Sequence, residues 1–247
     1  MSAFWLRLIA CVAMLLDHIG YLHNDMTLRA IGRIAFPIFT YLLCNGFRHT
    51  SSRWRYALRL AIFALLSQIP FSLLCANTLR YQTGNVFFTL LAALLCIWAT
   101  DLLRKGRVGK WLCWLPTVFL CLVYQLGWLY SDYGARGIVL AMIFYVFDGK
   151  KWWQRLTVSA CCLISVFYSQ LVSIAMALVM HGKLSVPVWN RWDLWQLFSL
   201  AALPLIFLYN GKEGPTPQNK FLAKAVQLGF YLFYPAHMLL LWLLNLL

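Results

Sequence analysis

The feature that most constrains this chain is a succession of long apolar runs separated by short polar connections. A helix that crosses a bilayer needs roughly 20 mostly apolar residues, and runs of about that length follow one another along the whole sequence. The runs cover residues 4–22, 30–47, 56–77, 86–103, 111–130, 133–147, 156–180, 194–210 and 221–247. Because 62% of the residues are hydrophobic and 11% are charged, a soluble domain is excluded. We predict an all-α polytopic membrane protein with about nine transmembrane helices.

Two of these runs contain residues that disturb a spanning helix. The run 30–47 contains Arg33 and Pro37, and we expect a break at Pro37 because proline removes a backbone hydrogen bond. The sixth run is short and contains Arg136. The first run lacks a signal-peptide cleavage site and is interpreted as the first spanning helix. No repeat or low-complexity tract is present, so residues 1–247 are predicted to form a single domain.

The basic residues are distributed unevenly between the two sets of connections. Short cytoplasmic loops accumulate Lys and Arg. With the N-terminus inside, 13 of the 21 basic residues fall in inner loops: Arg48, Arg53, Arg55, Arg104, Lys105, Arg107, Lys110, Lys150, Lys151, Arg155, Lys212, Lys220 and Lys224. Six fall in outer loops or at their rims: Arg29, Arg33, Arg80, Arg136, Lys183 and Arg191. We therefore predict an N-in, C-out orientation. The net charge of +14 then reflects topology and attraction to anionic membrane lipid, and no nucleic-acid partner is expected.

The residues that most often bind metals in proteins do not form a recognisable ligand set here. All eight cysteines lie in apolar runs and none belongs to a Cys-x-x-Cys motif, so we interpret them as small hydrophobic residues. Asp17, His18, His23 and Asp25 lie close together in the sequence, but their spacing matches no known metal site. No metal is expected.

The first apolar run contains two adjacent ionisable residues, Asp17 and His18. An ionisable group within the hydrocarbon region costs at least a few kcal/mol and usually faces a cavity or a partner. Adjacent residues of a helix point about 100° apart, so these two are not expected to pair directly. Arg7 and His18 are close to three helical turns apart, which places them on one face at a separation of about 16 Å. Alternatively, Arg7 reaches the inner headgroups and His18 lies at the outer interface.

Charged residues also lie at both ends of the second apolar run, and the last run contains a further histidine. Arg29 and Arg33 are near the start of the second run, and a basic inner loop follows it. In the last run, His237 follows Pro235. Polar groups within membrane segments often serve a function, so these residues join Asp17 and His18 as candidates for a functional site.

Seven blocks of the sequence, taken in order, resemble the TraX-type family of pilin N-acetylases, which are encoded with conjugative transfer systems. The blocks are MLLDHIG, GRIAFPIFTYLLCNGFRHT, RLAIFALLSQIPF, NVFFTLLAALL, SDYGARGIVLAMIFY, LYNGKEG and YLFYPAHMLLL. The family is similar to the wider membrane acyltransferase-3-like proteins, whose first helix carries a basic residue and a histidine separated by ten residues, as Arg7 and His18 are. The resemblance implies a multi-pass acetyltransferase of the bacterial inner membrane. Its acetyl donor would be cytoplasmic acetyl-CoA, and its acceptor the N-terminal amine of a pilin subunit.

The resemblance and the chemistry of acyl transfer suggest roles for the candidate residues. His18 would act either as a general base or as a covalent acyl acceptor. Asp17 would orient His237 or hold the cationic amine. Arg29 and Arg33 would contact the substrate or the thioester oxyanion. The phosphates of CoA would bind basic side chains towards the inner face, for which the candidates are Arg7, Arg48, His49, Arg53, Arg55 and Arg59. Asn85, Asp132 and Asn210 are expected only as helix caps or supporting polar residues.

Two other classes of function remain open on the sequence. A transporter for a small anion would also use broken helices and intramembrane charges, although the paired half-repeats of many transporters are not found. A non-catalytic protein of pilus biogenesis would use the aromatic content of 17% for packing and for the interfacial belt. Within the enzyme class, a different acceptor such as a sugar is the alternative to a pilin.

Overall fold

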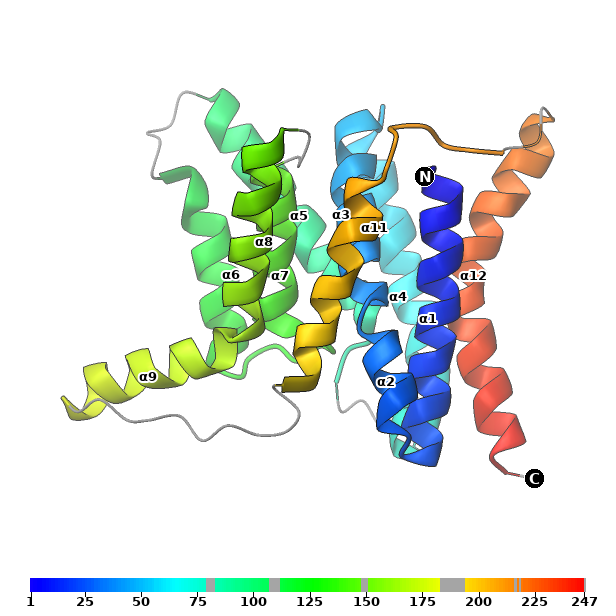
Figure 1. Ribbon diagram of the computed structural model, residues 1–247, viewed down its shortest axis with the longest axis horizontal. Coiled ribbons are helices and arrows are strands. Elements are labelled where there is room, and N and C mark those ends of the chain that lie inside the picture. Colours follow the sequence, from blue (N-terminus) through cyan, green and yellow to red (C-terminus); the bar gives the residue numbers. More distant parts are fainter. Residues whose placement is uncertain are drawn as a thin grey trace.

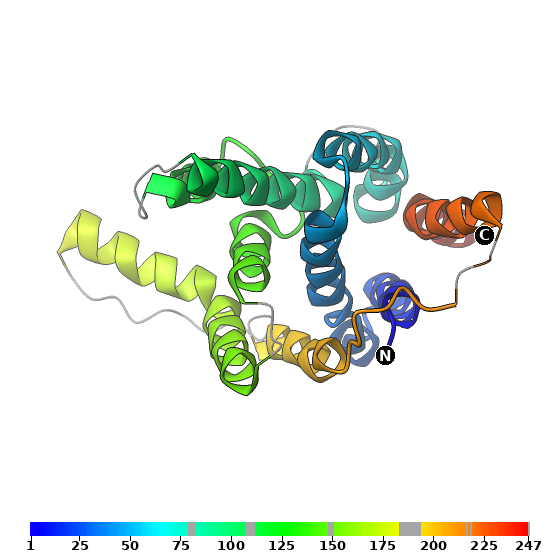
Figure 2. The same ribbon diagram turned by 90° about the horizontal axis from the view of Figure 1, so that it is seen from above.

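The computed structural model describes residues 1–78, 83–106, 112–147, 151–182, 194–215, 217 and 219–246. In this part of the chain the regular structure is helical, apart from one isolated bridge between Gly84 and Ser131. Most helices run roughly parallel or antiparallel to one another (Figure 1). The view from above shows α1 and α12 as neighbours towards one edge of the assembly, with α9 projecting from the opposite edge (Figure 2).

Five helical segments of the described part are long and apolar enough to cross a membrane. They are α1 (Ala3–His23), the consecutive helices α2 (Met26–Gly32) and α3 (Ala35–His49), α4 (Arg53–Ala76), α5 (Val86–Lys105) and α12 (Lys220–Leu244, whose apolar part begins at Phe221). The prediction of an all-α, multi-pass membrane protein is therefore confirmed at this level.

The remaining helices are shorter. They are η1 (Leu112–Trp114), α6 (Leu115–Gln125), α7 (Gly134–Val146), α8 (Trp152–Val166), α9 (Tyr168–His181), η2 (Gln196–Ala201) and α11 (Ala202–Phe207). The predicted run 156–180 is not one straight span, because α8 and α9 meet at an angle of 62° and α9 points away from the bundle (Figure 1). If this bent pair is counted as one span, six spans are present in the described residues, and the count of nine stays a prediction.

The second apolar run is broken, but not at the predicted residue. The break lies at Arg33 and Ile34, between α2 and α3, whereas Pro37 is the third residue of α3. Proline is tolerated there because the first N–H groups of a helix have no partner within the helix. α2 packs closely against α1, since a Cβ atom on Gly32 would overlap Asp17. The break therefore places Arg33 at the junction of two helices, next to α1.

The two ends of the bundle differ in charge. Met1 lies at one end, which we call the N-terminal end, and the C-terminus lies at the opposite end, which we call the far end (Figure 1). The α3–α4 connection, the last turn of α5 and the start of α12 also lie at the N-terminal end. Those basic residues predicted for the inner loops that the structure describes therefore lie at the N-terminal end. Six of the predicted residues lie outside the described part: Arg80, Arg107, Lys110, Lys150, Lys183 and Arg191.

A buried polar side chain connects the start of α5 to α4. Asn85 is fully buried and caps α5 by accepting a hydrogen bond from the backbone N–H of Phe87. Its amide group also donates to the carbonyl oxygen of Ala64, at 2.7 Å, and to Gln68 Oε1, at 3.0 Å. Asn210 accepts a bond from the backbone N–H of Lys212. Asn85 is therefore a helix cap, as predicted, whereas Asn210 is exposed and its bond lies in a connection outside the helices.

Candidate active site

Two histidines from opposite ends of the sequence meet between α1 and α12. His18 Nδ1 lies 3.0 Å from His237 Nε2, and the two ring centroids are 5.0 Å apart. His237 is buried, with 5% of its surface exposed, and His18 is half-buried. Tyr234, one helical turn before His237 on α12, packs edge-on against both rings. The sequence identified both histidines as candidates but did not predict their contact.

The hydrogen-bond partners determine which nitrogen of each ring carries the proton. His237 Nδ1 lies 2.7 Å from the carbonyl oxygen of Phe233, which can only accept, so this nitrogen donates. In the neutral ring Nε2 is then unprotonated and accepts from His18 Nδ1. His18 Nδ1–H also lies 2.9 Å from the carbonyl oxygen of Met14, so it is shared between two acceptors. His18 Nε2 therefore has a free lone pair, and no described group forms a hydrogen bond with it.

Asp17 is engaged in a separate cluster. Its Oδ1 atom lies 3.2 Å from a terminal nitrogen of Arg33 and 3.9 Å from Nε of Arg29. Arg29 also stacks over the ring of Tyr21, at 5.2 Å from the centroid. Asp17 therefore compensates the charges of two arginines, and its use to orient His237 or to hold a cationic amine stays a prediction. This cluster adjoins the histidine pair, because Asp17 precedes His18 in α1.

A cavity of about 300 Å³ opens from the N-terminal end, and we call it the near cavity. Arg7, His49 and Arg59 line its charged part. Its deeper walls are mostly aromatic and aliphatic, and they include Met14, Phe87, Leu90, Tyr231 and Tyr234. Met14 and Tyr234 both contact His18. The near cavity thus extends from a basic region to the side chains that surround the histidine pair.

The residues predicted to bind CoA separate into two groups. Arg7, His49 and Arg59 line the near cavity, where Arg7 pairs with Glu213 at 3.0 Å and Arg59 lies over the ring of Tyr56. The other three are not among its lining residues. Arg48 donates to the carbonyl oxygens of Phe144 and Tyr145, Arg53 pairs with Asp101 at 2.7 Å, and Arg55 is exposed at the start of α4. Arg48 and Arg53 therefore hold α3 and α4 against α7 and α5.

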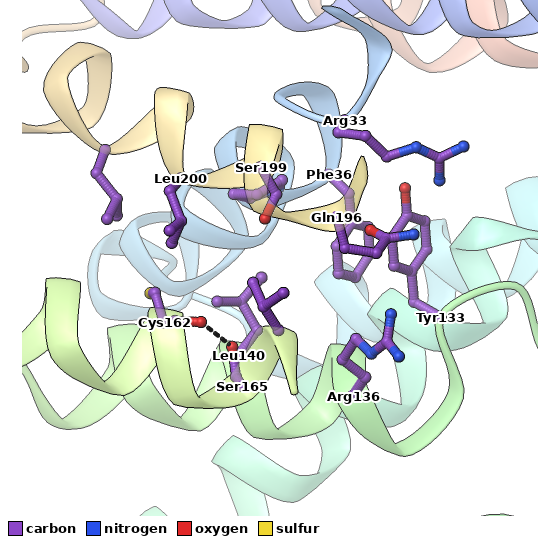
Figure 3. A pocket seen from close by; sticks show the side chains of 13 residues that line it. Arg33, Phe36, Tyr133, Arg136, Leu140, Cys162, Ser165, Gln196, Ser199 and Leu200 are labelled. Carbon is purple, nitrogen blue, oxygen red and sulfur yellow. Dashed lines mark hydrogen bonds between the residues drawn. The ribbon is translucent and has the colours of Figure 1, made fainter. Parts of the chain in front are cut away.

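A second cavity, of about 340 Å³, lies at the far end, and we call it the far cavity. Its walls come mainly from the α6–α7 connection, the start of α7 and Arg33. A narrow pocket of about 30 Å³ shares four of its lining residues: Arg33, Tyr133, Arg136 and Gln196. Figure 3 shows the guanidinium ends of Arg33 and Arg136 on either side of Gln196 and Tyr133. Arg33, which also pairs with Asp17, therefore joins the far cavity to the candidate active site.

Several lining residues were not identified from the sequence. Glu213, Tyr56, Gln227 and Tyr234 face the near cavity, and Tyr and Gln are common enough in membrane helices to carry no signal alone. Glu213 offered one signal, because it is the only acidic residue near the basic segment that contains Lys212. Among the described residues no group of three or more His, Cys, Asp or Glu side chains has the arrangement of a metal site.

Known proteins match this chain over nearly its whole length, as the sequence blocks do. The chain is 29% identical to a protein of Dichelobacter nodosus named "Probable fimbrial assembly protein FimC, serogroup H1", in an alignment that covers 97% of this chain and 94% of that protein. No solved structure matches the chain. The model of the family described as "TraX protein" matches residues 2–245. The match spans nearly the entire chain, which therefore belongs to the TraX protein family.

Proposed function

We propose that this protein is a membrane-bound acetyltransferase that moves an acetyl group from acetyl-CoA to an amine. The observation that carries the proposal is the His18–His237 pair, which leaves His18 Nε2 unprotonated in a histidine that contacts Met14 and Tyr234 of the near-cavity wall. A histidine in this state is suited to general-base or nucleophilic catalysis. His237 is a positioning residue in this proposal, because it accepts the hydrogen bond that orients His18.

The near cavity supports acetyl-CoA as the donor. The CoA molecule has a polyanionic nucleotide and a slim arm that ends in the thioester. Arg7, His49 and Arg59 would hold the phosphates, and the aromatic walls would enclose the arm. Arg7 and His18 are eleven residues apart on α1, so the arm would extend about 16 Å between them. Tyr234 and Met14 then line the route to His18.

The transfer conserves atoms and charge. In the direct route the neutral amine nitrogen attacks the thioester carbonyl carbon while His18 Nε2 accepts a proton from that nitrogen. The carbon–nitrogen bond forms, the carbon–sulfur bond breaks, and the proton passes from His18 to the sulfur, which leaves as the CoA thiol. In the covalent route His18 Nε2 attacks the thioester carbonyl carbon and the CoA thiolate leaves. The amine then displaces His18 from the acetyl group, and the proton that the amine loses passes to the thiolate, which gives the CoA thiol. An acetyl group found covalently bound to the protein after incubation with acetyl-CoA alone would favour the covalent route.

The N-terminal amine of a pilin subunit is the acceptor that we propose. TraX family membership and the similarity to a protein named for fimbrial assembly support a role in pilus biogenesis or conjugation. The donor is cytoplasmic, so we further propose an inner-membrane location with nine crossings, the N-terminus and the loop at residues 50–52 inside, and the C-terminus outside. Reporter fusions at Ser52 and at the C-terminus should report opposite sides of the membrane, and the same side for both would contradict this topology.

Transfer across the membrane is the corresponding test of activity. The purified protein is reconstituted in sealed vesicles of uniform orientation, with labelled acetyl-CoA on the N-terminal side and a short peptide with a free amino terminus enclosed on the other side. We expect labelled peptide and an equal release of CoA thiol, and we expect neither product with His18→Ala. Thiol release at the same rate in the His18→Ala protein would contradict the assignment of the site.

A non-catalytic role in pilus assembly is the second candidate, and the printed name of the Dichelobacter nodosus relative is the observation that favours it. In that case acetyl-CoA would not be consumed in the presence of any acceptor amine. Replacement of His18 would then leave pilus assembly intact in cells. Loss of assembly in cells that contain normal amounts of the His18→Ala protein would instead favour catalysis.

A further inference from the structure

The far cavity differs from the near cavity in the chemistry of its walls. Polar and charged side chains supply much of its lining: Arg33, Gln125, Tyr130, Asp132, Arg136 and Gln196. None of these residues belongs to the near cavity. A cavity with such walls at one end of a membrane protein favours a polar ligand that arrives from the aqueous side.

Asp132 is the acidic residue of this cavity, and its carboxylate has no partner in the described part of the chain. The other four described acidic side chains bind cations or cap a helix: Asp17, Asp25, Asp101 and Glu213. The side chain of Asp132 is exposed in the far cavity, and the nearby positive charge of Arg33, which lines the same cavity, favours its ionised form. The carboxylate therefore lies within the electrostatic influence of Arg33 but forms no hydrogen bond or salt bridge with a described residue.

Asp132 is held in place by the backbone around it. Its N–H donates to the carbonyl oxygen of Gly84 at 2.9 Å, and the N–H of Gly84 donates to the carbonyl oxygen of Tyr130 at 2.9 Å. Ser131, which lies between Tyr130 and Asp132 in the sequence, donates a hydrogen bond to the hydroxyl oxygen of Tyr124 at 3.0 Å. These bonds anchor the α6–α7 connection to the start of α5. The backbone that carries the Asp132 side chain is therefore held in place before a ligand binds, which lowers the entropy cost of binding.

The far cavity adjoins the candidate active site through Arg33. One terminal nitrogen of Arg33 lies 3.2 Å from Asp17, the residue that precedes His18. Because Asp17 is occupied by Arg33 and Arg29, it is a poor site for a cationic substrate. Asp132 also experiences the positive charge of Arg33, but unlike Asp17 it forms no salt bridge with a described residue.

We propose that the far cavity is the acceptor site and that Asp132 binds the acceptor as a primary ammonium group, such as the amino terminus of a peptide. The inference rests on the proposed function and specifies its acceptor. Arg136 and the two glutamines of the cavity would donate to peptide carbonyl oxygens. The ammonium group docks in its charged form and must release one proton to water before the neutral amine reaches His18 Nε2.

The decisive experiment measures binding without catalysis. The probe is a short uncharged peptide of Gly, Ala and Ser with a fluorophore at its carboxyl end, prepared with a free or an acetylated amino terminus. Fluorescence anisotropy with the purified full-length protein, in the absence of acetyl-CoA, gives the two dissociation constants. We expect the wild-type protein to bind the free-amine form about tenfold more tightly, and Asp132→Asn to bind both forms equally.

Two further variants control for charge and folding. Asp25→Asn removes one negative charge near the far end, where Asp25 caps α2, and asparagine caps a helix equally well. It should keep the tenfold preference. Asp132→Glu should keep most of it, because the charge is retained. A wild-type protein without preference for the free amine, or an Asp132→Asn protein that keeps the preference, would overturn the inference.

Turnover measurements separate this inference from the proposed function. With acetyl-CoA present, Asp132→Asn should raise the KM for the peptide about tenfold and leave the KM for acetyl-CoA unchanged. If acetyl transfer occurs but the KM for the peptide does not change in this variant, the acceptor site is wrong and the acetyltransferase stands. If the binding preference exists but no acetyl is transferred, the cation site stands and the acetyltransferase fails.

Discussion

The near cavity and the far cavity have similar volumes, about 300 and 340 Å³, but opposite character. The near cavity combines a basic region with aromatic and aliphatic walls, whereas the far cavity has polar walls that contain Asp132 together with Arg33 and Arg136. The first suits a polyanion with a slim apolar arm, and the second suits a polar cation. Between them lie the His18–His237 pair and the Asp17–Arg33 pair. Under the two proposals above, the bundle separates its two substrates by charge before they meet.

Replacement of His18 should have the largest effect, because it removes the proposed catalytic group, which contacts Met14 and Tyr234 of the near-cavity wall and follows Asp17, the partner of Arg33. We expect His18→Ala to lower the rate of acetyl transfer at least 100-fold, which is typical for loss of a general base or nucleophile. Binding of acetyl-CoA and of the acceptor peptide should change little. Rates measured under single-turnover conditions, together with both dissociation constants, would check this. If the His18→Ala protein bound acetyl-CoA and the peptide weakly but transferred the acetyl group at nearly the wild-type rate, His18 would not be the catalytic group.

Replacement of His237 should have an intermediate effect. His237→Ala removes the acceptor that orients His18, but the carbonyl oxygen of Met14 still accepts from His18 Nδ1. We therefore expect kcat to fall about tenfold, with both KM values nearly unchanged. The pH dependence of kcat should also shift, because the environment of His18 changes, and a merely structural role would not produce that shift. A loss as large as that of His18→Ala would make His237 the base.

Two arginines of α4 test whether the near cavity binds acetyl-CoA, because one lines the cavity and the other does not. Arg59→Gln removes a charge that lines the cavity, so we expect the KM for acetyl-CoA to rise about fivefold to tenfold while the KM for the peptide is unchanged. Arg55→Gln is the matched control, because Arg55 is exposed and does not line this cavity. Equal effects of the two variants would indicate that general surface charge attracts the donor.

A buried residue that lines neither cavity should show the smallest catalytic effect. Asn85→Ala removes the N-cap of α5 and leaves buried polar groups without partners. The free energy of unfolding should fall by about 1 to 2 kcal/mol, with both KM values unchanged. Unfolding in mixed detergent would measure the first quantity. A change in only one KM would show that the Asn85 network also shapes that cavity.

Much of this protein can be predicted from local sequence patterns. The length and hydrophobicity of the runs indicate spanning helices because a bilayer offers no partners for a free backbone. The eleven-residue spacing of Arg7 and His18 on α1 needs only the geometry of one helix. The basic connections were likewise correctly grouped at one end, where they are described. The family was identified because its sequence blocks occur in a fixed order.

What the sequence by itself determined was the helical membrane class, the family and the candidate histidines. Only the tertiary structure decided which of these residues meet. His18 and His237 are 219 residues apart, and Arg48 reaches backbone carbonyls 96 and 97 residues away. The break at Arg33 rather than at Pro37 also depends on the close approach of α2 to α1. The reason is physical: a local pattern fixes the face of a helix on which a side chain lies, whereas its partner depends on which other helix packs against that face.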